Sequence, residues 1–173
     1  MACALTQGFN LDCQNGFGGV KEVYVMEFAN ATTITQTAGV VTLITKATGK
    51  QFWKYNLIAS TGEADDTLTR NRENGTQMSK QSVKFPINKM TAAVRNELLL
   101  LAQNFLLIVV VDRNGTGWLY GSDMGMILET AGGKTGKALT DRNGYELVFS
   151  SDEKSLAVPL DATTLGTLTT PGV

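Results

Sequence analysis

One polar stretch, residues 65–87, constrains the fold of this chain more than any other part of the sequence. At its middle lies Asn74-Gly75, the pair that most favours a two-residue hairpin turn of type I′, because both residues tolerate a positive φ. Folding about that turn places Asp65 opposite Lys84 and gives two arms of roughly 20 Å, at about 3.3 Å per residue. A two-stranded ribbon without an apolar face is marginal by itself. The stretch is therefore predicted to be a long hairpin that a neighbouring copy of the chain holds.

The charged residues of this stretch are unevenly distributed. Between residues 70 and 89 the basic residues face a single acid, Glu73, whereas three acids lie just upstream. Complementary charges of this kind favour alignment of identical subunits edge to edge, and a solvated charged face is the alternative. The candidate contacts between copies are Glu63, Asp65, Asp66, Arg70, Arg72, Glu73, Asn74, Gly75, Lys80 and Lys84.

The length of 173 residues and the apolar content of 43% fit one domain with a core of its own. We expect an N-terminal arm over residues 1–19, a single β-sandwich domain over residues 20–151 and a C-terminal extension over residues 152–173. The last part of that extension, residues 163–173, is expected to be a flexible tail or an arm used in assembly.

Charge and hydropathy restrict the partners of the chain. The net charge of −1 argues against a dedicated nucleic-acid-binding protein, because neutralising phosphates requires a basic surplus. The N-terminus lacks the basic start and apolar region of a signal peptide, and the longest apolar run, residues 105–111, is too short to span a bilayer. Synthesis in the cytoplasm without membrane insertion is therefore expected. Free thiols are favoured for Cys3 and Cys13, and a disulfide between them stays open.

Short apolar runs separated by turn signals predict a mainly β fold of about eight strands. The run at residues 105–112 is apolar enough to be the central strand. One convincing helix is expected at about residues 90–103, where apolar residues recur at helical spacing and should pack on a sheet. We therefore predict an α+β fold: a β-sandwich or distorted barrel with this helix at its flank and the hairpin at residues 65–87 projecting from it.

The connections in this scheme carry turn or loop residues. Residues 30–37 form a polar, threonine-rich connection, and residues 131–137 form a loop rich in glycine and lysine. Outside the hairpin, the expected strands are 20–28, 39–45, 52–59, 105–112, 118–121, 124–129 and 145–150.

The sequence contains no complete catalytic or cofactor-binding motif. It has no histidine, which removes the commonest general acid–base residue and the triads built on it. The segment Gly132–Thr135 resembles part of a phosphate-binding loop, but the first glycine of that motif is replaced by Leu128. The Asp-Arg-Asn-Gly segments at 112–115 and 141–144 are explained by turn chemistry better than by calcium binding. We therefore expect no enzyme activity, no metal and no cofactor.

Three stretches together resemble tail tube proteins of tailed bacteriophages. They are Asn71-Arg-Glu-Asn-Gly-Thr76 at the hairpin tip, Arg95-Asn-Glu-Leu-Leu-Leu-Leu-Ala-Gln103 leading into the apolar strand and Trp118-Leu-Tyr-Gly121, and Thr135-Gly-Lys-Ala-Leu-Thr-Asp-Arg-Asn-Gly-Tyr-Glu-Leu-Val-Phe149. The segment Ala4–Cys13 looks like the start of such virion proteins as well. The resemblance covers most of residues 3–150.

The resemblance implies a structural protein of the phage tail that is made in the bacterial cytoplasm. It implies homohexameric rings of β-sandwich subunits with a flanking helix. The rings stack into a hollow tube, adjoin other tail proteins, and let double-stranded DNA pass during genome ejection without sequence-specific contact. The sheets of neighbouring subunits form the wall of the lumen, and terminal arms help to lock the stack. Related architectures occur in the tubes of contractile injection systems and type VI secretion.

In that family a long hairpin reaches an adjacent subunit or ring. Residues 67–83 match this element. The resemblance makes Arg70, Arg72, Lys80 and the adjacent Lys84 candidates for contact with the acids of a neighbour. The chain departs from the family in one respect, because tube lumens tend to be acidic whereas this hairpin is basic. A contact between rings is therefore a safer expectation for the hairpin than a position in the lumen.

Two alternatives stay open. One is another ring-forming virion protein of the same fold, such as a tail terminator, a neck ring or a short-tail ring. The other is a monomeric β-barrel that binds a small ligand, which would require a cavity.

Overall fold

The centre of the molecule is strand β7 (Leu106–Asp112), which is apolar on both faces and buried over almost its whole length. The computed structural model describes residues 8–9 and 16–173, so Cys3, Cys13 and most of the expected arm lie outside the described residues. The other elements are β1 (Val20–Glu27), η1 (Phe28–Asn30), β2 (Ala31–Thr37), β3 (Val40–Lys46), β4 (Trp53–Asn56), β5 (Glu63–Arg70), β6 (Gln77–Asn88), α1 (Ala92–Gln103), β8 (Gly117–Tyr120), β9 (Ile127–Lys134), β10 (Gly144–Glu153), β11 (Val158–Pro159) and α2 (Ala162–Thr167).

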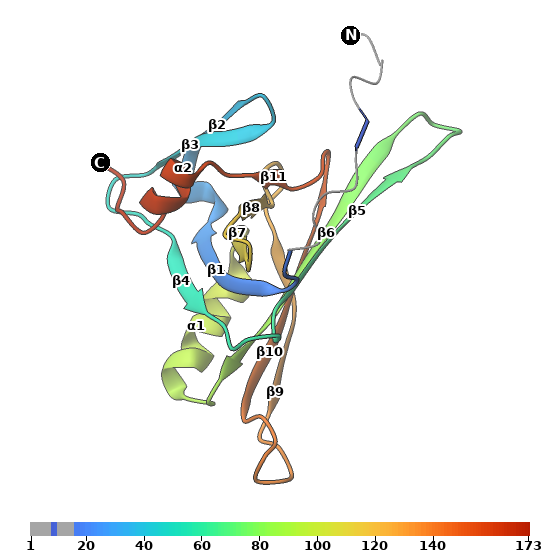
Figure 1. The fold of residues 1–173 in the computed structure, drawn as a ribbon. Coiled ribbons are helices and arrows are strands. Elements are labelled where there is room, and N and C mark those ends of the chain that lie inside the picture. Colours follow the sequence, from blue (N-terminus) through green and yellow to red (C-terminus); the bar gives the residue numbers. More distant parts are fainter. Residues whose placement is uncertain (1–7, 10–15) are drawn as a thin grey trace.

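The strands form three antiparallel sheets (Figure 1). A five-stranded sheet has the order β11-β8-β7-β1-β4, a four-stranded sheet has the order β5-β6-β10-β9, and β2 and β3 form a separate pair. The predicted class, a mainly β sandwich with a flanking helix and a projecting hairpin, is confirmed.

The two faces of β7 belong to two hydrophobic clusters, which explains why its sequence does not alternate. Leu106, Ile108 and Val110 pack with Phe85 and Phe149 of the four-stranded sheet. The alternate residues Leu107, Val109 and Val111 pack in a second cluster. That cluster also contains buried residues of β3 and of the C-terminal segment: Val41, Ile44 and Leu168. The five-stranded sheet is thus a middle layer, covered on one face by the four-stranded sheet and on the other by β2, β3 and α2.

The predicted helix is confirmed as α1. The hydroxyl Oγ1 of Thr91 caps it by accepting a hydrogen bond from the backbone N–H of Val94 at 3.2 Å. Leu98 and Leu101 bury one side of the helix in the core between the two larger sheets. The adjacent residues Leu99 and Leu100 are 48% and 55% exposed, so only part of the broad apolar stripe packs on the chain itself.

The structure differs from the predicted scheme at residues 30–37, because all of them except Asn30 form strand β2 rather than a loop. Threonine favours strands, and Ile34 at the centre of the segment packs against the second cluster. The count of about eight strands was low because β2 and the two-residue strand β11 have too few apolar residues to be recognised.

The glycines at 132 and 133 lie inside strand β9, where a loop was expected. A Cβ atom at Gly133 would lie 2.9 Å from a ring atom of Tyr145 on the neighbouring strand β10. A glycine at this position lets the aromatic ring lie against the backbone of β9.

The C-terminal extension packs on the domain instead of extending as a tail. Leu168 is 1% exposed in the second cluster, and the ammonium of Lys46 donates to the carbonyl oxygens of Thr167, Leu168 and Thr170. Gly172 forms a bridge to Thr48. These contacts fix the segment that sequence composition assigned to a flexible tail or an assembly arm.

The hairpin exists, but its turn and its register differ from the prediction. Arg70 pairs with Gln77 and Asp65 with Ser82, so the partners shift by two residues. Residues 71–76 form the loop, in which the side chain of Asn71 accepts hydrogen bonds from the backbone N–H groups of Glu73 and Asn74. This Asx-type turn replaces the type I′ turn, which would need a positive φ at Asn74. A shift of two residues leaves every side chain on its predicted face.

The base of the hairpin belongs to the core, which corrects the view that a neighbour must hold all of it. Strand β6 pairs with β10 from Asn88 to Ser79, and Val83 and Phe85 are completely buried. Farther toward its tip the hairpin projects from the rest of the molecule (Figure 1), although Leu68 and Gln77 still line a groove with residues 155–159.

Candidate assembly surfaces

The four-stranded sheet presents one polar face and two edges that other chains can reach. Lys80, Ser82 and Lys84 alternate with buried residues of β6 and point away from the core. Among the described residues, β5 forms ladder hydrogen bonds only with β6, and β9 only with β10. Both edge strands are eight residues long and contain no proline, so each offers a row of unused backbone groups to another strand.

Some of the contacts expected between copies form within one chain instead. The ammonium of Lys84 lies 3.4 Å from a carboxylate oxygen of Glu63 and 3.8 Å from one of Asp65. Lys80 lies opposite Asp152 across β6 and β10. Exposed ion pairs of this kind stabilise the fold by at most about 1 kcal/mol each. They nevertheless neutralise charges that were expected to pair with a neighbouring copy. The outer face of the sheet therefore carries mixed, partly compensated charge.

Asp66 has an internal structural position. Its carboxylate accepts a hydrogen bond from the Ser79 hydroxyl and another from the backbone N–H of Ala157. These bonds join β5 to β6 and to the segment that precedes β11. The residue is half-buried, and it also lines the pocket described below.

The remaining candidates gather at the hairpin tip. Arg70, Arg72, Glu73 and Asn74 are exposed, and Gly75 has a φ of 65°. Within the part of the chain that the structure describes, neither arginine forms an ion pair. Two apolar side chains of the same arms, Leu68 and Met78, are 48% and 42% exposed. The tip thus combines free positive charge with exposed apolar surface.

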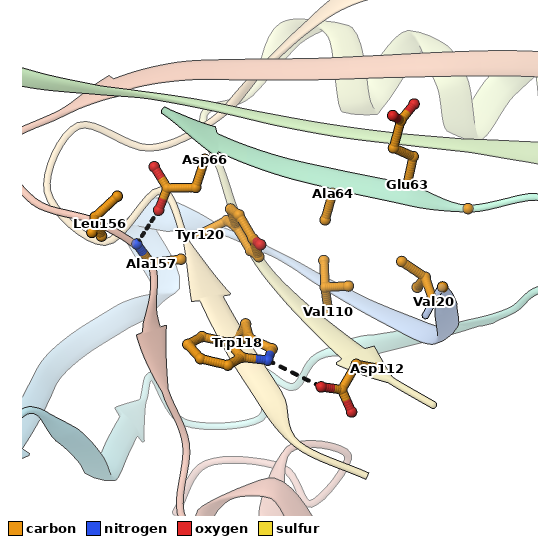
Figure 2. A pocket seen from close by; sticks show the side chains of 12 residues that line it. Val20, Glu63, Ala64, Asp66, Val110, Asp112, Trp118, Tyr120, Leu156 and Ala157 are labelled. Atoms are coloured by element: carbon orange, nitrogen blue, oxygen red, sulfur yellow. Dashed lines mark hydrogen bonds between the residues drawn. The ribbon is translucent and has the colours of Figure 1, made fainter. Parts of the chain in front are cut away.

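The structure also contains a pocket that sequence reasoning missed (Figure 2). It has a volume of about 520 Å³ and lies between the base of β5 and the ends of β7 and β8. Val20, Val110 and Tyr120 provide apolar and aromatic wall, and Trp118 lies beside them. The lining residues come from segments far apart in the chain, between Gly19 and Ala157, so no local pattern could have revealed the pocket.

Three acids lie around this pocket: Glu63, Asp66 and Asp112. The indole N–H of Trp118 donates to a carboxylate oxygen of Asp112 at 3.4 Å, and the other oxygen of Asp112 accepts from the backbone N–H groups of Asn114 and Thr116. Among the described residues, no lysine or arginine lines the pocket, although Arg113 lies beside Gly19 at its edge. The negative charge around the pocket therefore favours a cationic ligand over an anionic one.

Burial, together with the charges of Asp66 and Asp65, raises the pKa of Tyr120 to about 12. The phenol is neutral at all ordinary pH values. Its hydroxyl therefore stays neutral beside the carboxylates of the pocket and does not act as a base.

A buried polar network supports the loop between β8 and β9. Glu153 is 3% exposed, and its carboxylate accepts hydrogen bonds from the backbone N–H groups of Asp123 at 2.8 Å and Met124 at 3.2 Å. The Ser151 hydroxyl donates to the same carboxylate at 3.0 Å. The amide oxygen of Gln81 accepts from the backbone N–H of Gly121 at 3.0 Å. These bonds fix the loop against the base of the hairpin.

Among the described residues, no cluster of histidine, cysteine or acidic side chains has an arrangement that could hold a metal ion. No helix in the described ranges has both the length and the apolar character to cross a lipid bilayer. Comparisons of the chain with models of protein families, with curated proteins and with solved structures gave no significant match.

Proposed function

We propose that this chain is a structural virion subunit that assembles into rings, and that stacked rings form the tube of a phage tail through which DNA is delivered. The observation that carries the proposal is the four-stranded sheet with its two open edges. The sequence resemblance supplies the hexameric ring and the tail as the setting, with other tail proteins as neighbours.

The strand directions of this sheet support ring closure. Each neighbouring pair in the order β5-β6-β10-β9 is antiparallel, so β5 and β9 run in opposite directions. Rotation about a ring axis preserves the direction of each strand. The β9 edge of one copy would therefore lie antiparallel to the β5 edge of the next copy, and the alternation would continue from subunit to subunit. Closure of this kind removes both exposed edges.

The charge of the outer sheet face is compatible with a lumen. Lys84 is neutralised by Glu63 and Asp65, and the ammonium of Lys134 lies 3.7 Å from a carboxylate oxygen of Glu146. Because strong binding to DNA depends on uncompensated basic residues, such a face would hold passing DNA weakly. The hairpin tip, with its free arginines, extends away from this sheet body and suits a contact between copies.

Cysteine cross-linking tests the edge pairing. Thr67 and Thr130 lie near the middle of β5 and β9, on the outer face of the sheet. In a chain with Cys3→Ser and Cys13→Ser, the pair Thr67→Cys and Thr130→Cys is expected to give an oxidation ladder of multimers that ends at a closed ring. Each single substitution is the matched control and should give no ladder. Monomer alone after oxidation of the double variant would contradict pairing of these edges.

A second candidate function follows from the pocket beside β5. Aromatic walls with carboxylates nearby are the chemistry that binds small organic cations. A monomer that binds such a ligand is the alternative that the pocket favours, and sedimentation of the purified chain separates the two proposals.

A further inference from the structure

We propose that the pocket between β5 and β8 receives the hairpin tip of a second copy of this chain, led by Arg70 and Arg72. This inference rests on the proposed function, because it requires that copies of the chain assemble. It goes further by naming the two surfaces that meet and the chemistry that joins them.

The pocket has the chemistry that an arginine side chain needs. A guanidinium group stacks on aromatic rings and pairs with carboxylates, and it is more weakly hydrated than an ammonium group. Trp118 and Tyr120 supply the rings, while Asp66 and Asp112 supply negative charge, which they keep while accepting their internal hydrogen bonds. At the rim, Leu156 is 47% exposed and offers apolar surface.

The tip has the complementary chemistry. Its two arginines have no ion-pair partner among the described residues, in contrast to Lys84 farther down the same hairpin. Leu68 and Met78 add exposed apolar surface just below them. From Asp66, the lining residue of β5 nearest the tip, to Arg70, the strand advances roughly 13 Å at about 3.3 Å per residue. The tip is therefore clear of the body that carries its own pocket, as Figure 1 shows.

The relative position of the two surfaces fixes the type of assembly. Because the tip and the pocket are different surfaces of the same chain, the contact between them is heterologous. Such a contact leaves one free tip and one free pocket at the ends of any pair, so it repeats from copy to copy. Strand β5 forms both a wall of the pocket and one arm of the hairpin. Successive copies would therefore follow one another along the direction of the hairpin. The contact therefore adds a second connection to the edge pairing of the sheets.

A charge exchange tests the proposal in the full-length chain. Leu156→Lys introduces a positive charge at the pocket rim without removing a hydrogen bond, and Arg70→Glu with Arg72→Glu reverses the tip. Each change alone is expected to raise the protein concentration needed for assembly by about tenfold or more, because like charges then meet. All three substitutions together give the reversed tip one positive partner at the rim and should recover part of the loss, because the acids of the pocket remain.

The control is Arg142→Glu, which reverses one arginine, as each tip substitution does, in the exposed loop between β9 and β10, away from the tip and the pocket. It should assemble like the unmodified chain. Thermal unfolding of each variant shows whether the monomer is intact. An equal loss of assembly in the control, or a triple variant no better than its parents, would overturn the assignment.

Fluorescence adds a readout that reports the pocket itself. The chain contains two tryptophans, so Trp53→Phe leaves Trp118 as the sole indole emitter. The emission of Trp118 is expected to change on assembly of this chain and not on assembly of the tip variant. If all variants assemble normally with unchanged emission, the pocket assignment fails and the proposed function stands. If the unmodified chain never assembles, both fail. A saturable response of the monomer to free arginine, with no effect of Leu156→Lys on assembly, would assign the pocket to a small cation instead.

Discussion

A chain in which Asn-Gly replaces residues 70–77 is expected to fold normally and to lose assembly. Thr69 and Met78 are partners in the observed register, so a two-residue turn between them closes the shortened hairpin without strain. The deleted residues include both free arginines and form no part of either hydrophobic cluster. The melting temperature of the monomer should therefore change by no more than a few degrees, while sedimentation shows no species beyond small oligomers.

Normal folding with loss of assembly is expected only if the projecting tip takes part in assembly and not in the core of the fold. Arg142→Glu, in the exposed loop between β9 and β10, is the control that leaves the tip unchanged. That control should assemble normally. A large fall in the melting temperature of the shortened chain would place the tip in the fold, and unchanged assembly would remove the hairpin from the account of self-association.

Glu153→Ala should lower the free energy of unfolding by roughly 2–3 kcal/mol, because it leaves buried hydrogen-bond donors without an acceptor. The backbone N–H groups of Asp123 and Met124 and the Ser151 hydroxyl lose their partner at once. Glu153→Gln retains an amide oxygen and should cost less. The measurement is urea unfolding followed by circular dichroism, in the shortened, monomeric background so that assembly does not contribute.

The neighbouring acid is the control for this effect. Asp152 lies on the outer face of the same strand and is exposed, so Asp152→Ala should change the free energy of unfolding by no more than about 0.5 kcal/mol. Equal losses for the two substitutions would show that the buried network around Glu153 does not contribute specifically to stability.

The elements that the sequence predicted well are those determined by local pattern. Strand β7 has a continuous apolar run because both of its faces are buried, and α1 combines a helical repeat with a capping residue, Thr91. The presence of a hairpin at residues 65–87 follows from its turn residues in the same way. These features depend on a few neighbouring residues, so they are visible in the chain itself.

The elements that were missed depend on distant partners. Strand β9 continues through its glycines because it pairs with β10, where Tyr145 lies against Gly133. The C-terminal segment is fixed by Lys46 and by the second cluster. The hairpin register was missed for a different reason, because two local turn signals compete. Asn74-Gly75 favours a two-residue turn, but Asn71 makes an Asx turn three residues earlier, and the wider loop results.

The candidate site was predicted in part. Arg70 and Arg72 are exposed and free to meet a neighbour, as a contact role requires, whereas Asp66 and Lys84 are engaged within the chain. The pocket could not be foreseen, because β5, β7 and β8 come together only through the order of strands in two separate sheets. Charge counting along the sequence indicated the basic residues of the hairpin, whereas the acids around the pocket come together only in the fold.

Electron microscopy of the purified full-length chain tests the central proposal most directly. Hollow cylinders of uniform diameter, built from stacked rings and longer at higher protein concentration, are the predicted result. Closed single rings at every concentration would contradict a tube and favour a terminator or neck ring. Separate monomers at every concentration would contradict the proposal that this chain is a subunit of an assembly.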